Sequence, residues 1–271
     1  MTSETRYVIR VALTVALGGF LMGFDASVIS GVVPFIEPEL GLSKIELGWA
    51  VASLTLTATL AMMVAGPLSD RLGRRPVLRI AAVLFAVSAL ASALAPDFIT
   101  LVAARMLGGL GVGAALIIAP MYIAEMAPPA MRGRMVSFNQ LNIVLGISAA
   151  FFSNYLILRL GHSDLGWAQA LRLGDWNWRW MVGVEALPAV FYFLALFAVP
   201  ESPRWLAMNG KDEDARRVLG KVSDSAQAAR DLQAVKASLR AEQSTERAAL
   251  GELFQPAMRR VLLIATSVAI L

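Results

Sequence analysis

The sequence predicts an all-α membrane protein, and its composition and the length of its apolar segments are the two observations behind this fold class. Of its 271 residues, 57% are hydrophobic and 16% are charged, whereas an average soluble domain is about 45–50% apolar and about 25% charged. A helix needs about 20 apolar residues to cross the hydrocarbon core of a bilayer. About six segments approach or exceed this length, at residues 8–33, 45–68, 77–95, 98–121, 135–160 and 180–199.

Prolines and charged links indicate where the expected helices end and how they are oriented. Pro76 is expected to open the third helix and Pro96 to follow its end. The links after the second and fourth helices are rich in arginine, whereas the link at 34–48 is acidic. Because positively charged links favour the cytosolic side of a membrane, we expect the amino terminus and both basic links to face the cytosol. The protein is then a multi-pass component of a lipid bilayer, the plasma or inner membrane of the cell.

The last part of the chain differs in character from the apolar segments. Residues 200–257 are charged and rich in helix-forming residue types, and they include acidic and basic residues spaced for i, i+4 pairing. A new apolar segment begins near 258, but its apolar residues extend only about 16 Å at 1.5 Å per residue, which is too short to cross a bilayer. We therefore expect a six-helix amino-terminal bundle at 1–199, a cytosolic helical linker at 200–257 and the start of a truncated seventh helix at 258–271, with a carboxy-terminal bundle missing.

Several classes of function are disfavoured by the residues present. The formal charge is +4, but the basic residues lie in short clusters between apolar segments and not together on one face, so we expect no nucleic-acid partner. The chain has no cysteine and one histidine, His162, in a polar loop, so we expect no metal site. GLGVGA at 109–114 loosely fits a dinucleotide-binding pattern, but no strand precedes it, and close packing of small residues is the better interpretation. We expect no cofactor.

Three ionisable residues lie deep in the expected spanning helices, and they are the first candidate site. Counting from the expected outer ends of their helices places Asp25, Arg105 and Glu185 about 11–13 Å below those ends. A charge at such a depth costs at least about 2.5–3.5 kcal/mol and is a functional hypothesis by default. Two acids beside an arginine that keeps its charge can hold one proton between them, as a proton-coupling site requires. The alternative is a structural ion pair that only fixes helix packing.

The segment GPLSDRLGRRP at 66–76 is the second candidate. Two glycines and two prolines surround alternating charges, in a link that allows only an antiparallel turn between the second and third helices. Asp70 can accept charge-assisted hydrogen bonds near a helix end, while Arg71, Arg74 and Arg75 can bridge to carboxylates on neighbouring helices. Arginines that merely set the topology would not explain Asp70 or the position of Gly73.

This segment resembles the cytoplasmic signature of the major facilitator superfamily, and other segments resemble its sugar porter family. They are GFDASVISG at 23–31, the long stretch at 105–140, WRWM at 178–181 and PESPRWL at 200–206. The resemblance covers nearly the whole chain. It implies a twelve-helix transporter built from two six-helix bundles, with alternating access to a central site and with sugar or polyol substrates.

The resemblance also assigns roles to particular residues. Asp25 matches the proton-accepting acid of the family's symporters, and Arg105 and Glu185 match its intramembrane companions. Gln140 matches a glutamine that hydrogen-bonds the sugar. An aromatic face suits a sugar as well, so Phe24 is a second candidate contact, with ordinary core or lipid-facing packing as its alternative.

The match is incomplete at Ile147, where some symporters carry another glutamine. At the cytosolic side, four further charged residues resemble the family's gate, in which salt bridges between helix ends close the inner side and break when the bundles move. The complete expected gate consists of Gly66, Asp70, Arg71, Gly73, Arg74, Arg75, Glu125, Arg132, Glu201 and Arg204.

The sequence thus predicts a secondary active transporter that couples protons to the uptake of a sugar or polyol. A facilitative carrier or a transporter-like sensor of the same fold is the alternative, and in it Asp25 would be structural. A membrane-embedded enzyme is a third class, and it is disfavoured because no nucleophile, metal set or phosphate-binding loop is present. Which sugar or polyol is transported stays open.

Overall fold

The computed structural model describes residues 3–244 together with 258, 261, 263 and 264. The described chain falls into two units, 1–232 and 233–271, and the account below concerns the first. Residues 245–257 and most of the expected seventh helix at 258–271 lie outside the described residues. Within residues 3–244, every regular element is a helix.

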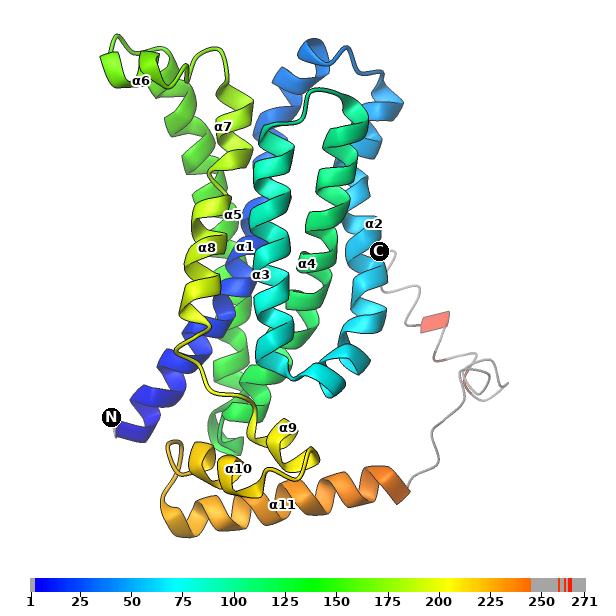
Figure 1. Cartoon of the computed structure of the whole chain (residues 1–271), viewed down its shortest axis with the longest axis vertical. Helices are drawn as coiled ribbons and strands as arrows, with labels where there is room; N and C mark the ends of the chain where they lie inside the picture. The colour runs from blue at the N-terminus through cyan, green and yellow to red at the C-terminus, as the bar shows by residue number, and fades with distance from the viewer. Residues whose placement is uncertain (1–2, 245–257, 259–260, 262, 265–271) are drawn as a thin grey trace. The chain divides into compact units, whose positions relative to one another are not determined.

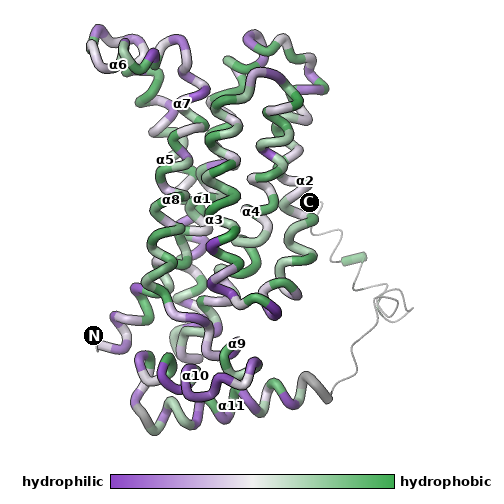
Figure 2. The backbone as a smooth tube through the Cα atoms, in the orientation of Figure 1, coloured by the Kyte–Doolittle hydropathy of each residue, from purple (hydrophilic) through white to green (hydrophobic). Residues whose placement is uncertain are grey.

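Among the described residues, five helices are long and apolar enough to cross a membrane. Their alternation of apolar bodies and polar ends is visible in Figure 2. They are α1 (Ser3–Glu39), α2 (Lys44–Leu72), α3 (Arg74–Ala93), α4 (Phe98–Met126) and α5 (Arg132–Gly161), the last preceded by the short 3₁₀ helix η1 (Pro129–Met131) (Figure 1).

The expected sixth segment is present as two consecutive helices, α7 (Asn177–Gly183) and α8 (Ala186–Ala195). The interruption at Val184 and Glu185 is explained by Pro188, which has no N–H and whose ring excludes the carbonyl four residues before it. The N–H of Leu187 accordingly bonds to Val184 O at 3.0 Å, three residues back. The interruption therefore places Glu185 at a local break between two helices.

Shorter helices complete the described chain. The helix α6 (Gly166–Ala170) lies in the link between α5 and α7. Within the charged segment, Ser202 caps α9 by accepting a hydrogen bond from Trp205 N, and Pro203 occupies the first turn. The helical character expected after residue 200 is confirmed over α9 (Pro203–Met208), α10 (Asp212–Leu219) and α11 (Ser225–Ser244).

Two links that we expected are mostly helical. The helix α1 continues through Pro34 and Pro38 to Glu39, so that the link at 34–48 shrinks to a few residues. The segment 66–76 is also helical except at Gly73, since α2 continues through Pro67 and α3 already begins at Arg74. A proline in the first turn of a helix loses no intrahelical hydrogen bond, which explains why α3 begins before Pro76. The turn expected between the second and third helices is therefore confined to Gly73, and the rest of the expected link is helical.

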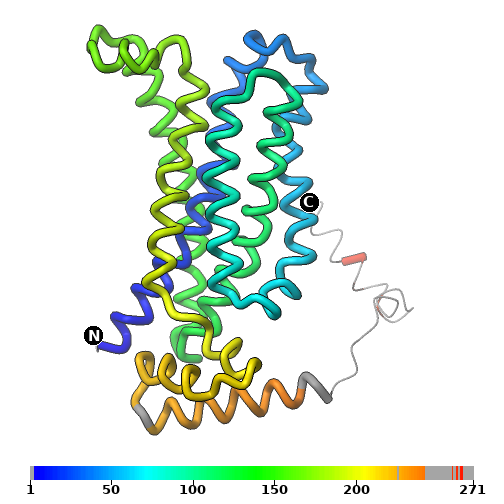
Figure 3. The backbone as a smooth tube through the Cα atoms, in the orientation of Figure 1, coloured from blue at the N-terminus to red at the C-terminus, as the bar shows by residue number. Residues whose placement is uncertain are grey.

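The long helices pack closely in pairs, most of them not consecutive in the sequence: α1 lies along α5, and α4 lies along α2 as well as along its neighbour α3 (Figure 3). Glycines make this approach possible. A Cβ atom at Gly113 of α4 would lie 2.1 Å from the Ala58 carbonyl oxygen of α2, and one at Gly23 of α1 would lie 2.0 Å from the Ile143 carbonyl oxygen of α5. The glycines at 109–114 thus serve close helix packing, as expected.

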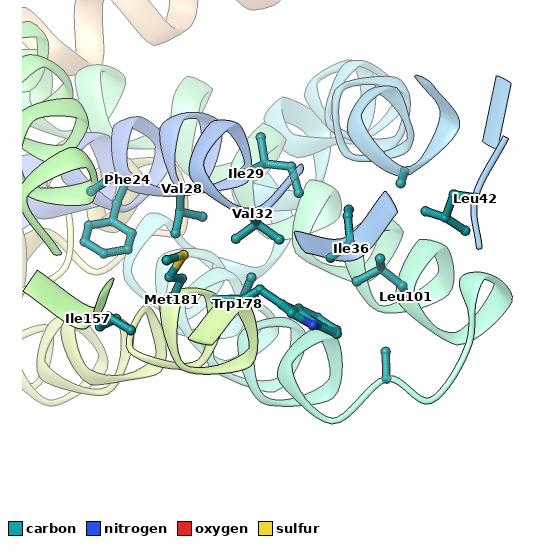
Figure 4. Close-up of a cluster of buried hydrophobic side chains, with 14 residues drawn as sticks. Phe24, Val28, Ile29, Val32, Ile36, Leu42, Leu101, Ile157, Trp178 and Met181 are labelled. Atoms are coloured by element: carbon teal, nitrogen blue, oxygen red, sulfur yellow. The ribbon is translucent and has the colours of Figure 1, made fainter. Parts of the chain in front are cut away.

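An apolar core fills the bundle at the end opposite Gly73. Figure 4 shows side chains of α1, such as Val28 and Val32, pointing toward Trp178 and Met181 of α7. Because Trp178 and Val32 are completely buried, this core joins α7 to the carboxy-terminal half of α1. Its other members include Phe24, Ile29, Ile36, Leu42, Ala50, Ala95, Leu101, Ala150, Ile157 and Val182.

We predict that Gly113→Ala destabilises the protein by about 1–3 kcal/mol, because the added methyl group meets backbone that can yield only if α2 and α4 separate. Gly48→Ala in α2 is the control, since no atom lies within 4 Å of its added Cβ. The measurement is thermal unfolding of the purified proteins in detergent. Equal melting temperatures for both variants would contradict the packing account.

Candidate functional site

The three intramembrane charges meet in one buried cluster. Asp25 of α1 and Arg105 of α4 form an ion pair, with Arg105 Nη1 3.5 Å from Asp25 Oδ1. Glu185 lies at the break between α7 and α8, and its carboxyl group lies close enough to that of Asp25 for the two to interact. The exposed fractions are 5% for Asp25, 3% for Arg105 and 2% for Glu185. The expectation that these residues lie at one level is therefore met.

The cluster is not fully satisfied by hydrogen bonds. Within the described part of the chain, Oδ2 of Asp25 and Nε of Arg105 are buried and have no hydrogen-bond partner. The ion-pair distance of 3.5 Å is also long beside the roughly 2.7–2.9 Å of a strong charge-assisted hydrogen bond. Buried ion pairs stabilise a fold only when their geometry is good and their remaining polar atoms are paired. The geometry of this ion pair is therefore not that of a fully satisfied structural pair.

Helix geometry brings the cluster together. Asp97 caps α4 by accepting a hydrogen bond from Thr100 N at 2.9 Å, and this cap defines where α4 begins. Arg105 follows Asp97 by about 12 Å along the helix. Because Gly109 and Gly113 let α4 approach α2 closely, Arg105 is held inside the bundle and not at its surface.

The two expected sugar contacts lie in different surroundings. Gln140 is exposed on α5, and its side chain makes no hydrogen bond to the residues that the structure describes. Phe24 is 4% exposed and belongs to the apolar core, where its ring lies 6.1 Å from that of Phe20. Its burial favours the packing alternative. Asn139 and Asn142, the neighbouring amide side chains of α5, are buried, so among these three amides only Gln140 is exposed.

At the other end of α3, Arg74 is the centre of an ion-pair network, which we call the gate network. Its side chain is 4% exposed. Nε and Nη2 donate to the two oxygens of Glu125 at 3.1 and 3.0 Å, and Nη1 donates to Asp70 Oδ1 at 2.8 Å. A bidentate pair of this kind is the strong form of an arginine–carboxylate contact. Arg74 thereby joins the ends of α2, α3 and α4.

Glu201 caps the amino terminus of α3 from outside the helix. Its carboxylate accepts hydrogen bonds from the backbone N–H groups of Arg74 and Arg75 at 3.1–3.3 Å, and from Ser202 N at 2.8 Å. Burial raises the pKa of the Glu201 carboxyl above its usual value, although these backbone hydrogen bonds oppose the shift. A negative group at a helix amino terminus is also stabilised by the helix dipole.

Gly73 is required by this arrangement for two reasons. Its φ of +102° is a conformation that residues with a side chain rarely adopt. A Cβ atom there would also lie 2.5 Å from Glu201 Oε2. By contrast, no atom lies within 4 Å of a Cβ placed on Gly66, so space does not explain a glycine there.

The helix α9 closes over the network. The hydroxyl of Ser202 donates to Glu125, Arg204 Nε lies 3.9 Å from Glu125 Oε1, and Trp205 Nε1 donates to the Asp70 carbonyl oxygen at 2.9 Å. Ser202 and Trp205 were not singled out in the sequence, although both lie in the PESPRWL segment.

Three expected gate residues lie apart from the Arg74–Glu125 pair. Arg75 donates instead to the carbonyl oxygens of Leu196 and Phe197, both at 3.0 Å, at the end of α8. Arg71 and Arg132 are exposed, and within residues 3–244 the structure records no ion pair for either.

A second set of contacts at the opposite end of the bundle was not expected. Glu39 of α1 accepts hydrogen bonds from Trp178 Nε1 at 2.6 Å and from Arg179 Nη2 at 3.1 Å. Arg179 Nη1 also donates to the carbonyl oxygens of Ala93 and Ala95. A tryptophan beside an arginine at the start of a helix, in the WRWM segment, is the sequence feature that could have indicated these contacts. The sequence does not reveal that their partner is Glu39, about 140 residues away.

Comparison with known proteins supports the fold. The chain matches the family described as "Sugar (and other) transporter" over residues 11–271. It is 40% identical to the arabinose-proton symporter of Bacillus subtilis over 97% of this chain and 55% of that protein, and 35% identical to the major myo-inositol transporter of the same organism over 99% and 55%. The chain spans about half the length of the curated relatives it matches.

A solved structure of the proton:xylose symporter XylE, bound to 6-bromo-6-deoxy-D-glucose, superposes with a TM-score of 0.82. The sequences are 36% identical, and the match covers 89% of this chain and 55% of that one. The helical bundle is thus that of a major facilitator membrane transporter. Within this class, the chain belongs to the sugar porter family, whose members are transporters and not enzymes.

We predict that Gly73→Ala lowers the free energy of unfolding by about 1–3 kcal/mol, because a side chain there is strained by the positive φ and collides with Glu201. Gly66→Ala lies in α2 with open space around it and should be neutral or stabilising by up to about 1 kcal/mol. Thermal unfolding of the two purified variants tests both. If Gly73→Ala unfolded at the same temperature as Gly66→Ala, the account of the turn would be wrong.

Proposed function

We propose that the protein is a secondary active transporter that carries a sugar or polyol together with a proton by alternating access. The single observation that carries this proposal is the buried cluster of Asp25, Arg105 and Glu185. Two carboxyl groups that lie close enough to interact repel each other when both are charged, and they can share a hydrogen bond only when one of them holds a proton. The geometry therefore suits a cluster that binds one proton and releases it.

The charge of the cluster changes with that proton. With one carboxyl protonated, Arg105 balances the remaining carboxylate, and the net charge is zero. After the proton leaves, two carboxylates face one guanidinium, and the net charge is −1. Because a net charge is costly inside a membrane, this difference gives proton binding a direct effect on which conformation of the transporter is favoured.

In this proposal, the gate network lies at the cytosolic side and keeps that side of the transporter closed while its ion pairs are intact. Its ion pairs join α2, α3 and α4 to α9, and salt bridges between helix ends can break when bundles rock against one another. Arg71 and Arg132 remain part of the proposed gate as exposed charges at the helix ends. In this proposal, the amino terminus lies on the cytosolic side of a cell membrane.

The substrate class is supported by the chemistry of α5 and by the relatives. Gln140 offers an uncharged amide that can both donate and accept hydrogen bonds, as sugar hydroxyl groups require. Relatives are described as an arabinose-proton symporter and a myo-inositol transporter, so both sugars and polyols fit. In a facilitative carrier of the same fold, Asp25 and Arg105 would form only a packing ion pair.

We predict that Asp25→Asn abolishes uphill accumulation of substrate, because the amide keeps the size of a protonated carboxyl but cannot release a proton. Substrate binding and exchange across the membrane should largely persist, since neither requires net proton movement. The measurement is accumulation by the reconstituted protein in vesicles with an imposed pH difference. Asp175→Asn is the control, because Asp175 forms an exposed ion pair with Arg172. A variant lacking the Asp25 carboxylate that still concentrates substrate would favour the facilitative carrier.

We predict that Gln140→Ala weakens substrate binding by about 1–3 kcal/mol, the cost of leaving a desolvated hydroxyl group without its partner. Membrane insertion and thermal stability should stay unchanged because Gln140 is exposed. Equilibrium binding of labelled sugar measures the effect. Ser148→Ala on the same helix is the control, since the Ser148 hydroxyl already donates to the Val144 carbonyl oxygen. Equal affinity in wild type and Gln140→Ala would remove Gln140 from the site.

A further inference from the structure

An open hollow runs along the amino-terminal half of α1, apart from the buried cluster and the gate network. Its volume is about 410 Å³, and it begins in the hydrophilic first turns of α1, which Figure 2 shows passing into an apolar stretch. Residues of α1 form most of its wall, and one residue of α5 closes it. The lining consists of Arg6, Ile9, Arg10, Leu13, Thr14, Leu17 and Asn142.

The part of this hollow nearest the amino terminus carries two positive charges, and no acidic residue is among its lining residues. Arg6 and Arg10 are both exposed, lie one helical turn apart and, among residues 3–244, form no ion pair. Like charges at i and i+4 repel each other and destabilise a helix. A phosphate group between the two guanidinium groups would neutralise both and accept several charge-assisted hydrogen bonds.

The part of the hollow further along α1 is an apolar wall. Leu13 and Leu17 follow Ile9 along one face of α1. The two polar side chains nearby bond to their own helices, because Thr14 Oγ1 donates to the Arg10 carbonyl oxygen at 2.9 Å and Asn142 Nδ2 donates to the Phe138 carbonyl oxygen at 2.9 Å. A small inorganic anion would leave this wall uncovered, whereas a hydrocarbon chain would cover it.

The length of the hollow matches one leaflet of a bilayer. Eleven residues separate Arg6 from Leu17, which corresponds to about 16 Å along a helix. Half of the hydrocarbon core is about 15 Å. Arg6 also precedes the first buried apolar residue of α1, Val8, so it lies where the polar and apolar regions of a membrane meet.

We propose that this hollow is a binding site for one anionic phospholipid. The phosphate group lies between Arg6 and Arg10, and an acyl chain follows Ile9, Leu13 and Leu17 toward the middle of the membrane. Basic pockets between membrane helices suit such head groups. The site uses none of the residues of the buried cluster or the gate network.

The test is lipid binding to the purified protein in detergent, measured by native mass spectrometry during titration with phosphatidylglycerol or with phosphatidylcholine of the same acyl chains. Wild-type protein should bind phosphatidylglycerol at least about 10-fold more tightly. The double variant Arg6→Gln/Arg10→Gln should lose about 10- to 30-fold in phosphatidylglycerol affinity, as removal of two positive charges near a membrane surface implies. Leu13→Asn should weaken both lipids.

The double variant Arg216→Gln/Arg217→Gln is the control, because it removes two exposed positive charges from α10 and should bind phosphatidylglycerol as wild type does.

Four results would overturn the proposal. The first is that phosphatidylglycerol does not bind, as expected if protein covers the hollow, and the second is that Arg6→Gln/Arg10→Gln binds it with unchanged affinity. The third is that the control loses as much affinity as that variant, which would indicate unspecific charge attraction. The fourth is that inorganic phosphate binds as tightly as the lipid and depends on the arginines, which would indicate a site for small anions.

Discussion

The burial of Arg105 beside two carboxyl groups is the constraint on which the rest of the bundle depends. Each of these charges costs several kcal/mol inside a membrane, and only their mutual proximity offsets that cost. The cluster therefore draws α1, α4 and the break between α7 and α8 to one point. Glycines let the helices approach one another closely. The bundle tolerates these ionisable groups because Arg105 balances the charge of one carboxylate.

Two further sets of contacts fix the bundle at its ends. Arg74 joins the ends of α2, α3 and α4 to the segment that carries α9, and Glu39 joins α1 to α7 and to the end of α3 through Arg179. Polar contacts therefore connect the helices at three levels, namely the gate network, the buried cluster and the contacts of Glu39. A bundle connected in this way can move as one body, which is what alternating access by rocking requires. The proton, under our proposal, acts at the middle level, and the gate network acts at one end.

Much of the fold could be predicted from local chemistry, and the failures have local physical causes. Apolar segments of membrane-spanning length predicted the helices, because backbone polar groups in a bilayer must be satisfied within the segment. The helix boundaries near Pro34 and Pro67 were wrong, because a proline near a helix end can be accommodated while neighbouring helices support the chain. The interruption at Glu185 was also missed, since nothing in the sequence distinguishes a proline that breaks the hydrogen-bond ladder, as Pro188 does, from one that does not.

The sequence by itself determined that this chain spans a membrane, that Asp25, Arg105 and Glu185 lie at similar depth, and that the segment around Gly73 carries a signature of charged residues. Hydropathy and helical rise suffice for these conclusions because both depend on residues close together in the chain. The tertiary structure alone decided that Arg74 pairs with Glu125, that Glu201 caps α3, that Phe24 is buried while Gln140 is open, and that Glu39 meets Arg179. These outcomes depend on the rotation of each helix about its axis and on contacts between residues far apart in the chain, and only the packing of all the helices together decides them.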